Sequence, residues 1–268
     1  MSAWPQTLTL LGAGKMGQAM LRGWLAAGLE AKAVTIIEPT PSAELTALCR
    51  TRGIALGPSA TPSEILVLAV KPQTFAAAAG PELADSRTLV VSIMAGKTIA
   101  NIRERLPAAG AIVRAMPNTP AAVGRGVAGA VAEKAVSAAQ KSWSETLFKA
   151  VGAFHWLDDE AQIDIVTAIS GSGPAYVFAL VEAMARAGTA LGLPSETAEG
   201  LARATVEGSG ELLHREPGSS AATLRQNVTS PGGTTAAALA VLQGADGLDA
   251  LMARACAAAA KRARELAG

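Results

Sequence analysis

The first 155 or so residues alternate short apolar runs with stretches of helical character. Each run is short and rich in branched aliphatic side chains; the runs lie at 7–11, 34–37, 65–70, 88–92 and 111–115. Near-continuous apolar runs of this kind are typical of parallel strands that are buried on both faces. The repetition of strand, helix and strand therefore predicts a doubly wound α/β domain.

The stretches between the runs predict helices at 15–28, 42–52, 73–79 and 98–106, and two edge strands at 126–132 and 152–156 flank a further helix at 137–150. After Asp158 the strand signals vanish and helical patterns continue, with breaks at 192–194, 214–219 and 230–233. We therefore expect two domains, an α/β domain at 1–157 and an all-α domain at 158–268.

A glycine-rich segment, Gly12–Gly17, follows the first run and opens the first predicted helix. Its glycines permit a tight turn, close approach to a pyrophosphate and close packing of helix on strand. The next run ends in Glu38, 21 residues past Gly17, a spacing typical of a ribose contact. The segment predicts a Rossmann-like domain that binds NAD(P)H; the predicted contacts are Gly12, Ala13, Gly14, Lys15, Met16, Gly17 and Glu38.

Glu38 also bears on which dinucleotide is bound. A carboxylate accepts hydrogen bonds from ribose hydroxyls and repels a 2′-phosphate, which by itself favours NAD over NADP. Thr40 and Ser42 could instead donate to a phosphate, with Glu38 turned outward. The sequence leaves the choice between NADH and NADPH open.

Two further segments stand at the ends of predicted strands, Ala69–Pro72 and Ser92–Gly96. Ligands in open α/β sheets bind at the carboxyl ends of the strands, so both segments are expected to line the cofactor groove. Lys71 has two interpretations: a catalytic lysine, or a lysine beside the phosphates or in solvent. The second is favoured.

Three later segments are rich in Gly, Pro and Ser: Met116–Pro120, Gly171–Tyr176 and Ser230–Thr235. In the third, two glycines and two threonines precede a predicted helix and offer free backbone N–H groups and hydroxyls. That combination suits a small carboxylate. The alternative interpretation is an ordinary N-cap loop.

Composition narrows the possible functions. Lys and Arg total 23 against 22 Asp and Glu, so no field of one sign favours nucleic acid or an anionic membrane. Cys49 and Cys256 do not form a disulfide framework, and two histidines, His155 and His214, exclude a histidine-rich metal site. We find no signal-peptide pattern and no run of about 20 apolar residues free of glycine and charge. A soluble, cytoplasmic protein without a bound metal is therefore expected.

Hydrophobic residues make up 50% of the chain, but aromatic residues make up only 3% of it. Small aliphatic side chains let helices approach closely. We therefore expect tight helix–helix packing after residue 158.

The order and spacing of these segments resemble those of the pyrroline-5-carboxylate reductases. The matching segments cover nearly the whole chain: Gly12–Gly17, Val67–Gln73, Ala95–Gly96, Met116–Pro120, Gly171–Tyr176, 192–194 and Val228–Thr235. The resemblance implies reduction of the ring C=N of 1-pyrroline-5-carboxylate to L-proline with NAD(P)H. It also implies a Rossmann-like domain followed by an all-α C-terminal dimerisation domain, hence a homodimer or a larger homo-oligomer.

The resemblance further implies roles for individual residues. Cofactor contacts would fall on the glycine segment and on Ala69, Val70, Lys71, Pro72, Ala95, Gly96 and Asn227. The substrate would be held by Ser230, Gly232, Gly233, Thr234 and Thr235, with Thr235 as the catalytic residue near the imine nitrogen. Glu216 matches a family glutamate near the substrate, although its spacing to Asn227 is altered. Ser59 replaces an asparagine that the family often has near the adenosine ribose, which leaves the nucleotide preference open.

Two other functions remain alternatives. A β-hydroxyacid dehydrogenase or another imine reductase would share the domain order. The segment Gly171–Tyr176 and the helix start there offer no lysine, which argues against alcohol oxidation. A non-catalytic nucleotide-sensing module would leave the carboxylate site unused.

Overall fold

The structure, a computed structural model, describes residues 4–267. They divide into two compact units. The first unit runs to Ser172 and also includes the residues from Ala259 onward, and the second consists of Gly173–Ala258. Each unit has its own architecture.

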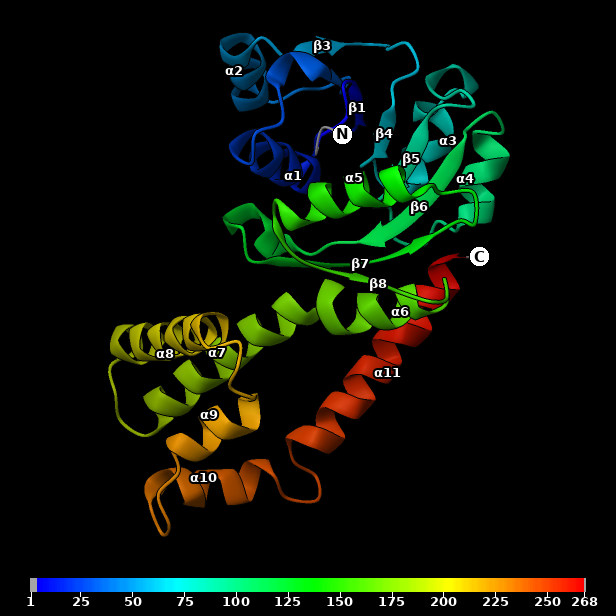
Figure 1. The fold of residues 1–268 in the computed structure, drawn as a ribbon. Helices are drawn as coiled ribbons and strands as arrows, with labels where there is room; N and C mark the ends of the chain where they lie inside the picture. Colours follow the sequence, from blue (N-terminus) through cyan, green and yellow to red (C-terminus); the bar gives the residue numbers. More distant parts are fainter. Residues whose placement is uncertain (1–3, 268) are drawn as a thin grey trace. The chain divides into compact units, whose positions relative to one another are not determined.

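The first unit is built on an eight-stranded sheet in the order β3-β2-β1-β4-β5-β6-β7-β8 (Figure 1). The strands are β1 Leu8–Leu11, β2 Val34–Ile37, β3 Ala55–Gly57, β4 Ile65–Leu68, β5 Leu89–Ser92, β6 Ala111–Met116, β7 Gly126–Ala132 and β8 Gly152–Trp156. The first six pair in parallel, β7 runs antiparallel to β6, and β8 is parallel to β7. The prediction of a mostly parallel, doubly wound sheet is confirmed, but β3 was not predicted.

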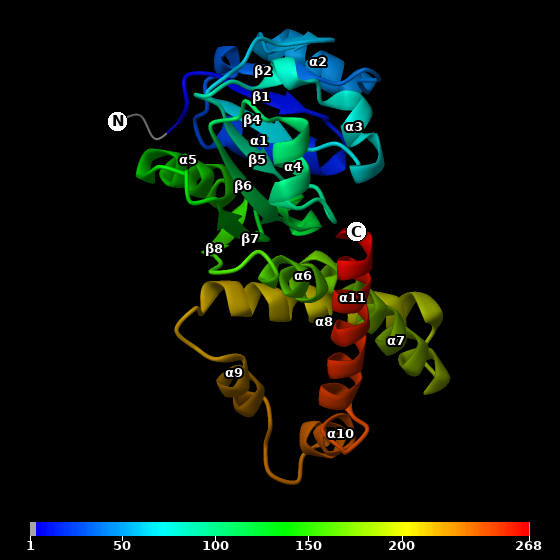
Figure 2. The same cartoon turned by 90° about the vertical axis from the view of Figure 1, so that its right-hand side faces the viewer.

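Helices cover both faces of this sheet (Figures 1 and 2). The core on one face is shared with α1 Lys15–Ala26, α2 Ala43–Arg52 and α5 Ala138–Lys149, and the core on the other with α3 Phe75–Ala78 and α4 Ile99–Arg105. Because side chains alternate along a strand, Leu10 belongs to the first core and Leu11 to the second. Trp24 is fully buried and its indole N–H donates to the Leu147 carbonyl at 2.8 Å, which ties α1 to α5.

The strand order places a topological switch between β1 and β4. From β1 the chain proceeds outward to β2 and β3, and from β4 it proceeds in the other direction to β5 and β6. The carboxyl ends of β1 and β4 are therefore neighbours, with Leu11 paired to Leu68. In open α/β sheets this is the place where ligands bind.

The end of the first unit lies beyond the boundary that the sequence predicts between residues 157 and 158. α6 Gln162–Val166 and the π-helix Thr167–Gly171 follow β8. A Cβ on Gly129 of β7 would stand 2.8 Å from a methyl of Val166, so α6 packs directly on the sheet. Residues up to Ser172 therefore group with the sheet although they are helical.

The second unit is entirely helical. It contains α7 Gly173–Ala190, α8 Ser195–Arg215, α9 Ala221–Asn227, α10 Thr234–Leu242 and the greater part of α11 Leu248–Ala267. A Cβ on Gly188 of α7 would stand 3.1 Å from the Cβ of Ala198 on α8. The expected close packing of helices through small side chains is present here, and the three predicted breaks separate these helices.

One stretch of the described chain, 162–190, is long and apolar enough to cross a membrane by length and composition alone. Such a stretch is weak evidence for a membrane span. It contains Asp164, Glu182 and Arg186 and is interrupted by the π-helix.

Candidate coenzyme and substrate sites

The glycine loop joins β1 to α1 at the switch point. The Gly12 N–H donates to the Ile37 carbonyl of β2 at 2.9 Å, and the Ala69 N–H donates to the Leu11 carbonyl at 2.8 Å. Gly12 has a φ of +88°, and a Cβ there would meet the Val70 nitrogen at 2.8 Å. Only glycine fits this turn, which is held between the ends of β2 and β4.

The other two glycines of the loop have different surroundings. A Cβ on Gly17 would stand 2.6 Å from the Gly12 carbonyl oxygen, so Gly17 lets α1 pack against the loop. A Cβ on Gly14 would meet no other atom of the described chain within 4 Å. Gly14 therefore borders open space at the start of α1.

The start of α1 suits an anion. Gly14 is its N-cap, no described side chain caps the helix, and its first turn holds no acidic residue. Free N–H groups and the positive end of the helix dipole then face the open space beside Gly14. Lys15 is exposed and Met16 half-buried at this point. These residues fit the pyrophosphate of a dinucleotide.

Glu38 follows β2 and turns toward the glycine loop. Its Oε2 accepts the Ala13 N–H at 2.9 Å, and its Oε1 accepts the Thr40 N–H at 3.2 Å and the Thr40 hydroxyl at 3.4 Å. The half-buried carboxylate is therefore anchored from two sides, within reach of the loop.

Ala69 and Val70, the first two residues of the segment Ala69–Pro72, pack against the glycine loop. A Cβ on Gly12 would stand 2.7 Å from a methyl of Val70, and one on Gly17 would stand 3.5 Å from the Ala69 Cβ. Lys71 is exposed, and its carbonyl accepts the N–H and the hydroxyl of Thr74 at 3.0 and 2.9 Å. A short 3-10 turn, Pro72–Thr74, begins there, so the predicted helix at 73–79 is reduced to α3. Ser59 is exposed in the loop after β3.

Ala95 and Gly96 form the turn after β5. Ala95 is exposed, whereas Gly96 is buried with a φ of +67°. A Cβ on Gly96 would stand 2.7 Å from the Leu266 carbonyl oxygen. The last turn of α11 therefore packs against this loop. This contact by itself requires a glycine at position 96, whether or not a coenzyme binds beside the loop.

The segment Met116–Pro120 is joined to the π-helix. The buried Asn118 side chain donates to the Ser170 carbonyl at 3.1 Å and accepts the Val127 N–H at 2.9 Å. A Cβ on Gly171 would stand 2.8 Å from the Met116 methyl group. Asn118 thus holds together two of the motifs that the sequence singles out.

The predicted substrate residues of the second unit gather at the start of α10. Gly232 has a φ of +69°, Gly233 is the N-cap of α10, and no described side chain caps the helix. A Cβ on Gly233 would lie 2.5 Å from the Ser230 hydroxyl oxygen, so Ser230 folds over the cap. Thr234 is exposed and Thr235 half-buried in the first turn. Helix start and hydroxyls together can hold a small carboxylate.

Two other predicted residues of this unit lie at helix ends. Glu216 is the exposed C-cap of α8, and Asn227 is the exposed last residue of α9. Ser220 caps α9 by accepting the Thr223 N–H at 3.1 Å. The predicted cofactor contacts are thus divided between the units: Asn227 belongs to the second and the rest to the first.

Sequence reasoning missed a buried ion pair beside the sheet. Arg114, in the centre of β6, donates through Nη1 to Oε1 of Glu160 at 2.9 Å, and its side chain is 4% exposed. The same oxygen accepts the Ile99 N–H at 2.8 Å at the start of α4. The signal in the sequence was an arginine inside an otherwise apolar strand.

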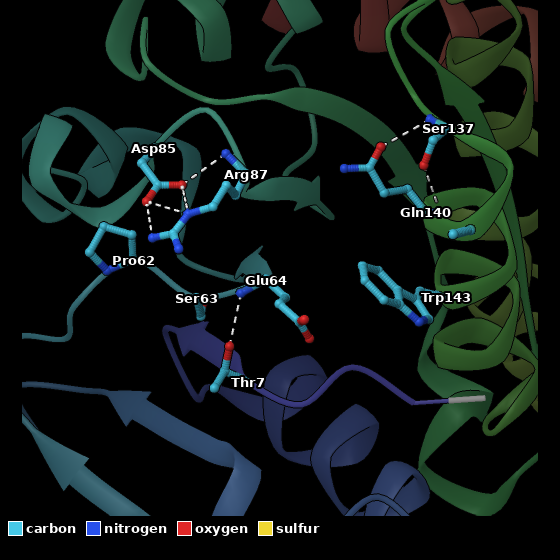
Figure 3. A pocket seen from close by; sticks show the side chains of 10 residues that line it. Thr7, Pro62, Ser63, Glu64, Asp85, Arg87, Ser137, Gln140 and Trp143 are labelled. Carbon is cyan, nitrogen blue, oxygen red and sulfur yellow. Dashed lines mark hydrogen bonds and ion pairs between the residues drawn. The ribbon is translucent and has the colours of Figure 1, made fainter. Parts of the chain in front are cut away.

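A cavity of about 330 Å³ lies in the first unit at the amino ends of β1, β4 and β5 (Figure 3). Its lining residues are Thr7, Pro62, Ser63, Glu64, Asp85, Arg87, Ser137, Ala139, Gln140 and Trp143. The charged groups of Asp85 and Arg87 pair at 2.7 Å, and Ser137 and Gln140 bond to each other at the start of α5. This cavity is at the opposite edge of the sheet from the glycine loop.

A second hollow of about 310 Å³ is apolar. It lies between β7, β8 and the helices that follow, lined by Val127, Gly129, His155, Leu157, Ile165, Val166, Ile169 and Ser170. Ile165 and Ile169 are 55% and 58% exposed, one helical turn apart. Within residues 4–267 no group of three or more His, Cys, Asp or Glu side chains is placed to hold a metal ion.

A glycine loop at the switch point of a doubly wound sheet, with a carboxylate at the end of β2, defines the class of dinucleotide-binding proteins. Comparison with known protein families agrees. Residues 7–96 match the model described as NADP oxidoreductase, coenzyme F420-dependent, and residues 160–266 match the pyrroline-5-carboxylate reductase dimerisation model.

Comparison with individual proteins identifies the family within this class. The pyrroline-5-carboxylate reductase of Pseudomonas aeruginosa is 40% identical over 97% of this chain and 96% of the relative. That of Pasteurella multocida is 39% identical over 88% of this chain and 89% of the relative. The chain belongs to the pyrroline-5-carboxylate reductase family.

Solved structures show the same relationship. A pyrroline-5-carboxylate reductase from Coxiella burnetii is 36% identical, with a TM-score of 0.90 over 98% of this chain and 99% of that one. A pyrroline carboxylate reductase from Plasmodium falciparum, solved with NADP bound, is 28% identical, with a TM-score of 0.79 over 98% of both chains. The fold predicted from the sequence is thus confirmed in both its parts.

Proposed function

We propose that this chain reduces 1-pyrroline-5-carboxylate to L-proline with NAD(P)H, the last step of proline biosynthesis. The observation that carries the proposal is its 40% identity to a pyrroline-5-carboxylate reductase over 97% of the chain. The glycine loop supports it, because it offers a helix start and open space where a pyrophosphate would lie. Family membership likewise favours this reaction over alcohol oxidation and over nucleotide sensing without catalysis.

In the first unit, the N–H groups at the start of α1 would hold the pyrophosphate and Glu38 would accept from the ribose hydroxyls. Ala69–Pro72 and Ala95–Gly96 would flank the coenzyme at the neighbouring strand ends, and Ser59 would lie beside the adenosine. When bound, the reduced nicotinamide supplies the hydride that the imine carbon receives. The contribution of the protein is to position the reactants, which is itself a large part of catalysis.

In the second unit, the start of α10 would hold the substrate carboxylate. Ser230, Gly232, Gly233 and Thr234 provide hydroxyls and backbone N–H groups, with no side-chain cap to compete in the described structure. The Thr235 hydroxyl would orient the ring nitrogen or relay a proton to it from water. Asn227 would contact the coenzyme and Glu216 the substrate. A protonated imine is already a good electrophile, so His155 and His214 have no catalytic role in this proposal.

A homodimer, or a larger homo-oligomer built from it, is the proposed assembly. The match to the dimerisation model begins at residue 160 and includes α6, the π-helix and the helices of the second unit. Many large apolar side chains in this range are exposed, among them Val177, Phe178, Leu180 and Met184 of α7. Exposed apolar surface of this extent marks an interface. Ile165 and Ile169, which line the apolar hollow of the first unit, are further exposed apolar side chains within the matched range.

The proposed location is the cytoplasm. Cys49 and Cys256 are both free thiols, which suits a reducing compartment. The net charge of +1 gives no basis for binding nucleic acid or a membrane surface.

A spectrophotometric assay tests the reaction directly. The purified chain is mixed with 1-pyrroline-5-carboxylate and either NADH or NADPH, and the loss of reduced-nicotinamide absorbance is followed together with the appearance of proline. We expect oxidation that depends on the imine and yields proline. The absence of oxidation with both coenzymes would overturn the proposal.

A further inference from the structure

The end of β2 is built around a fixed negative charge. Glu38 is anchored to the glycine loop through the Ala13 N–H at 2.9 Å and to its own turn through Thr40 at 3.2 and 3.4 Å. Turning Glu38 outward would break the bond to Ala13 and leave that N–H without its acceptor. The carboxylate is therefore held on the side of the loop where a ribose would lie.

Two hydroxyls of this turn, those of Thr40 and Ser42, could donate to a phosphate, and neither carries a charge. The Thr40 hydroxyl donates to Glu38, and the Ser42 oxygen accepts the Leu45 N–H at 3.1 Å as the N-cap of α2. Because Ser42 acts there as an acceptor, its O–H can still donate to a ligand. A 2′-phosphate would therefore find only neutral hydroxyl donors in this turn, beside the carboxylate of Glu38.

No positive charge in this turn offsets Glu38. The segment from Glu38 to Leu48 contains neither lysine nor arginine. Arg22 of α1 reaches this region, but it pairs with Glu44 at 2.7 Å. The arginines of α2, Arg50 and Arg52, stand in its last turn, about two helical turns beyond its start.

We propose that Glu38 makes this chain select NADH over NADPH, an inference that rests on the proposed reductase function. Glu38 accepts from the ribose hydroxyls of NADH, whereas the 2′-phosphate of NADPH meets a fixed carboxylate and finds no cation in the turn.

The test measures equilibrium binding first and turnover second. The dissociation constants of NADH and NADPH are measured by nicotinamide fluorescence on the full-length chain, without substrate. We expect the wild-type chain to bind NADH more tightly by a factor on the order of ten or more. Equal affinities, or tighter binding of NADPH, would overturn the inference.

A matched pair of variants assigns the effect to Glu38. Glu38→Gln removes the charge but keeps an oxygen that can accept the Ala13 N–H, so the turn is retained. NADPH binding should tighten and the preference should fall by about tenfold. Glu30→Gln removes the same charge at an exposed position before the start of β2 and should leave the preference unchanged. An unchanged preference in Glu38→Gln would also overturn the inference.

Measurements of turnover distinguish a failure of this inference from a failure of the proposed function. Steady-state kinetics with 1-pyrroline-5-carboxylate should show the same coenzyme preference in kcat/KM. If both coenzymes bind but neither is oxidised, the reductase proposal fails while the binding preference remains measurable. If the imine is reduced equally well with both coenzymes, the reductase proposal stands and the inference about Glu38 fails.

Discussion

Arg114 and Glu160 form an ion pair at 2.9 Å in which the arginine, in the centre of β6, is almost wholly buried. The arginine Nε has no hydrogen-bond partner among the described residues, and Glu160 is the ion-pair partner of the guanidinium group. Because Glu160 also accepts the Ile99 N–H, one carboxylate joins β6, the start of α4 and the segment that leads into α6.

Glu160→Ala should destabilise the fold more than most single substitutions. It leaves the Arg114 charge buried without a partner, which should lower the free energy of unfolding by about 3 kcal/mol. Chemical denaturation monitored by circular dichroism measures the change. Glu44→Ala is the control: it breaks the exposed pair with Arg22 and should cost about 1 kcal/mol or less. Equal losses in the two variants would contradict this account.

Substitutions at two glycines of the loop should affect different properties: Gly17→Ala the stability of the fold, and Gly14→Ala the affinity for the coenzyme. Gly17→Ala places a methyl 2.6 Å from the Gly12 carbonyl oxygen and should lower the free energy of unfolding by about 1–3 kcal/mol. Gly14→Ala meets no described atom and should cost about 1 kcal/mol or less. Its methyl would nevertheless enter the space proposed for the pyrophosphate, so NADH affinity should fall by about tenfold or more. Thermal melts and fluorescence titrations test the pair, and normal coenzyme binding by Gly14→Ala would argue against the site.

Thr235→Ala should impair the reaction itself. If the hydroxyl orients the ring nitrogen or relays its proton, kcat should fall by about 10²-fold, while Thr235→Ser should retain most of the activity. Steady-state kinetics with 1-pyrroline-5-carboxylate gives kcat and KM separately. Thr205→Ala removes an exposed hydroxyl that, in the described part of the chain, donates to the Leu201 carbonyl of its own helix, and this variant should behave as wild type. Unchanged kcat and KM in Thr235→Ala would refute the role of this residue.

Ile165→Asp should weaken the proposed dimer. Ile165 is 55% exposed on the apolar hollow, and a buried carboxylate at an interface is costly. Sedimentation velocity over a range of concentrations should show a dissociation constant raised roughly tenfold or more. Val123→Asp changes another exposed apolar residue, outside the dimerisation match, and should leave the dimer intact. A dimer of unchanged strength in Ile165→Asp would exclude the hollow from the interface.

Glu145 should make stability depend on pH in the acidic range. Its hydrogen bonds from Lys149 at 2.7 Å and from the Trp156 indole at 2.9 Å hold its pKa below the usual value. A lowered pKa contributes stability above the pKa of the unfolded chain, and this contribution is lost as the pH falls through the folded value. Glu145→Gln should therefore flatten this part of the stability curve, measured by denaturation at several pH values. Glu182→Gln, in an exposed pair, serves as control, and parallel curves for wild type and Glu145→Gln would contradict the prediction.

The sequence predicted the parallel strands because each is buried on both faces and its apolar run is nearly continuous. The strand β3 was not predicted, because this edge strand consists of Ala55, Leu56 and Gly57 and contains no β-branched side chain. The anchoring of Glu38 to Ala13 could not be read from the sequence, because it depends on how two loops meet in space. The packing around Gly96 could not be read from the sequence either, because the residue that contacts it in space, Leu266, lies 170 positions later in the sequence. The proposed contacts of Gly96 and of the other site residues with ligands remain predictions.

The packing of Leu266 against Gly96 has a consequence for synthesis of the protein. The sheet and its helices are complete in the chain by residue 172, yet the loop after β5 gains its covering turn only from Leu266, far later in the sequence. Domains fold as they emerge, from the N-terminus onward. On the ribosome, the sheet can therefore form early, while the turn beside β5 is covered only after the helices of the second unit have been synthesised.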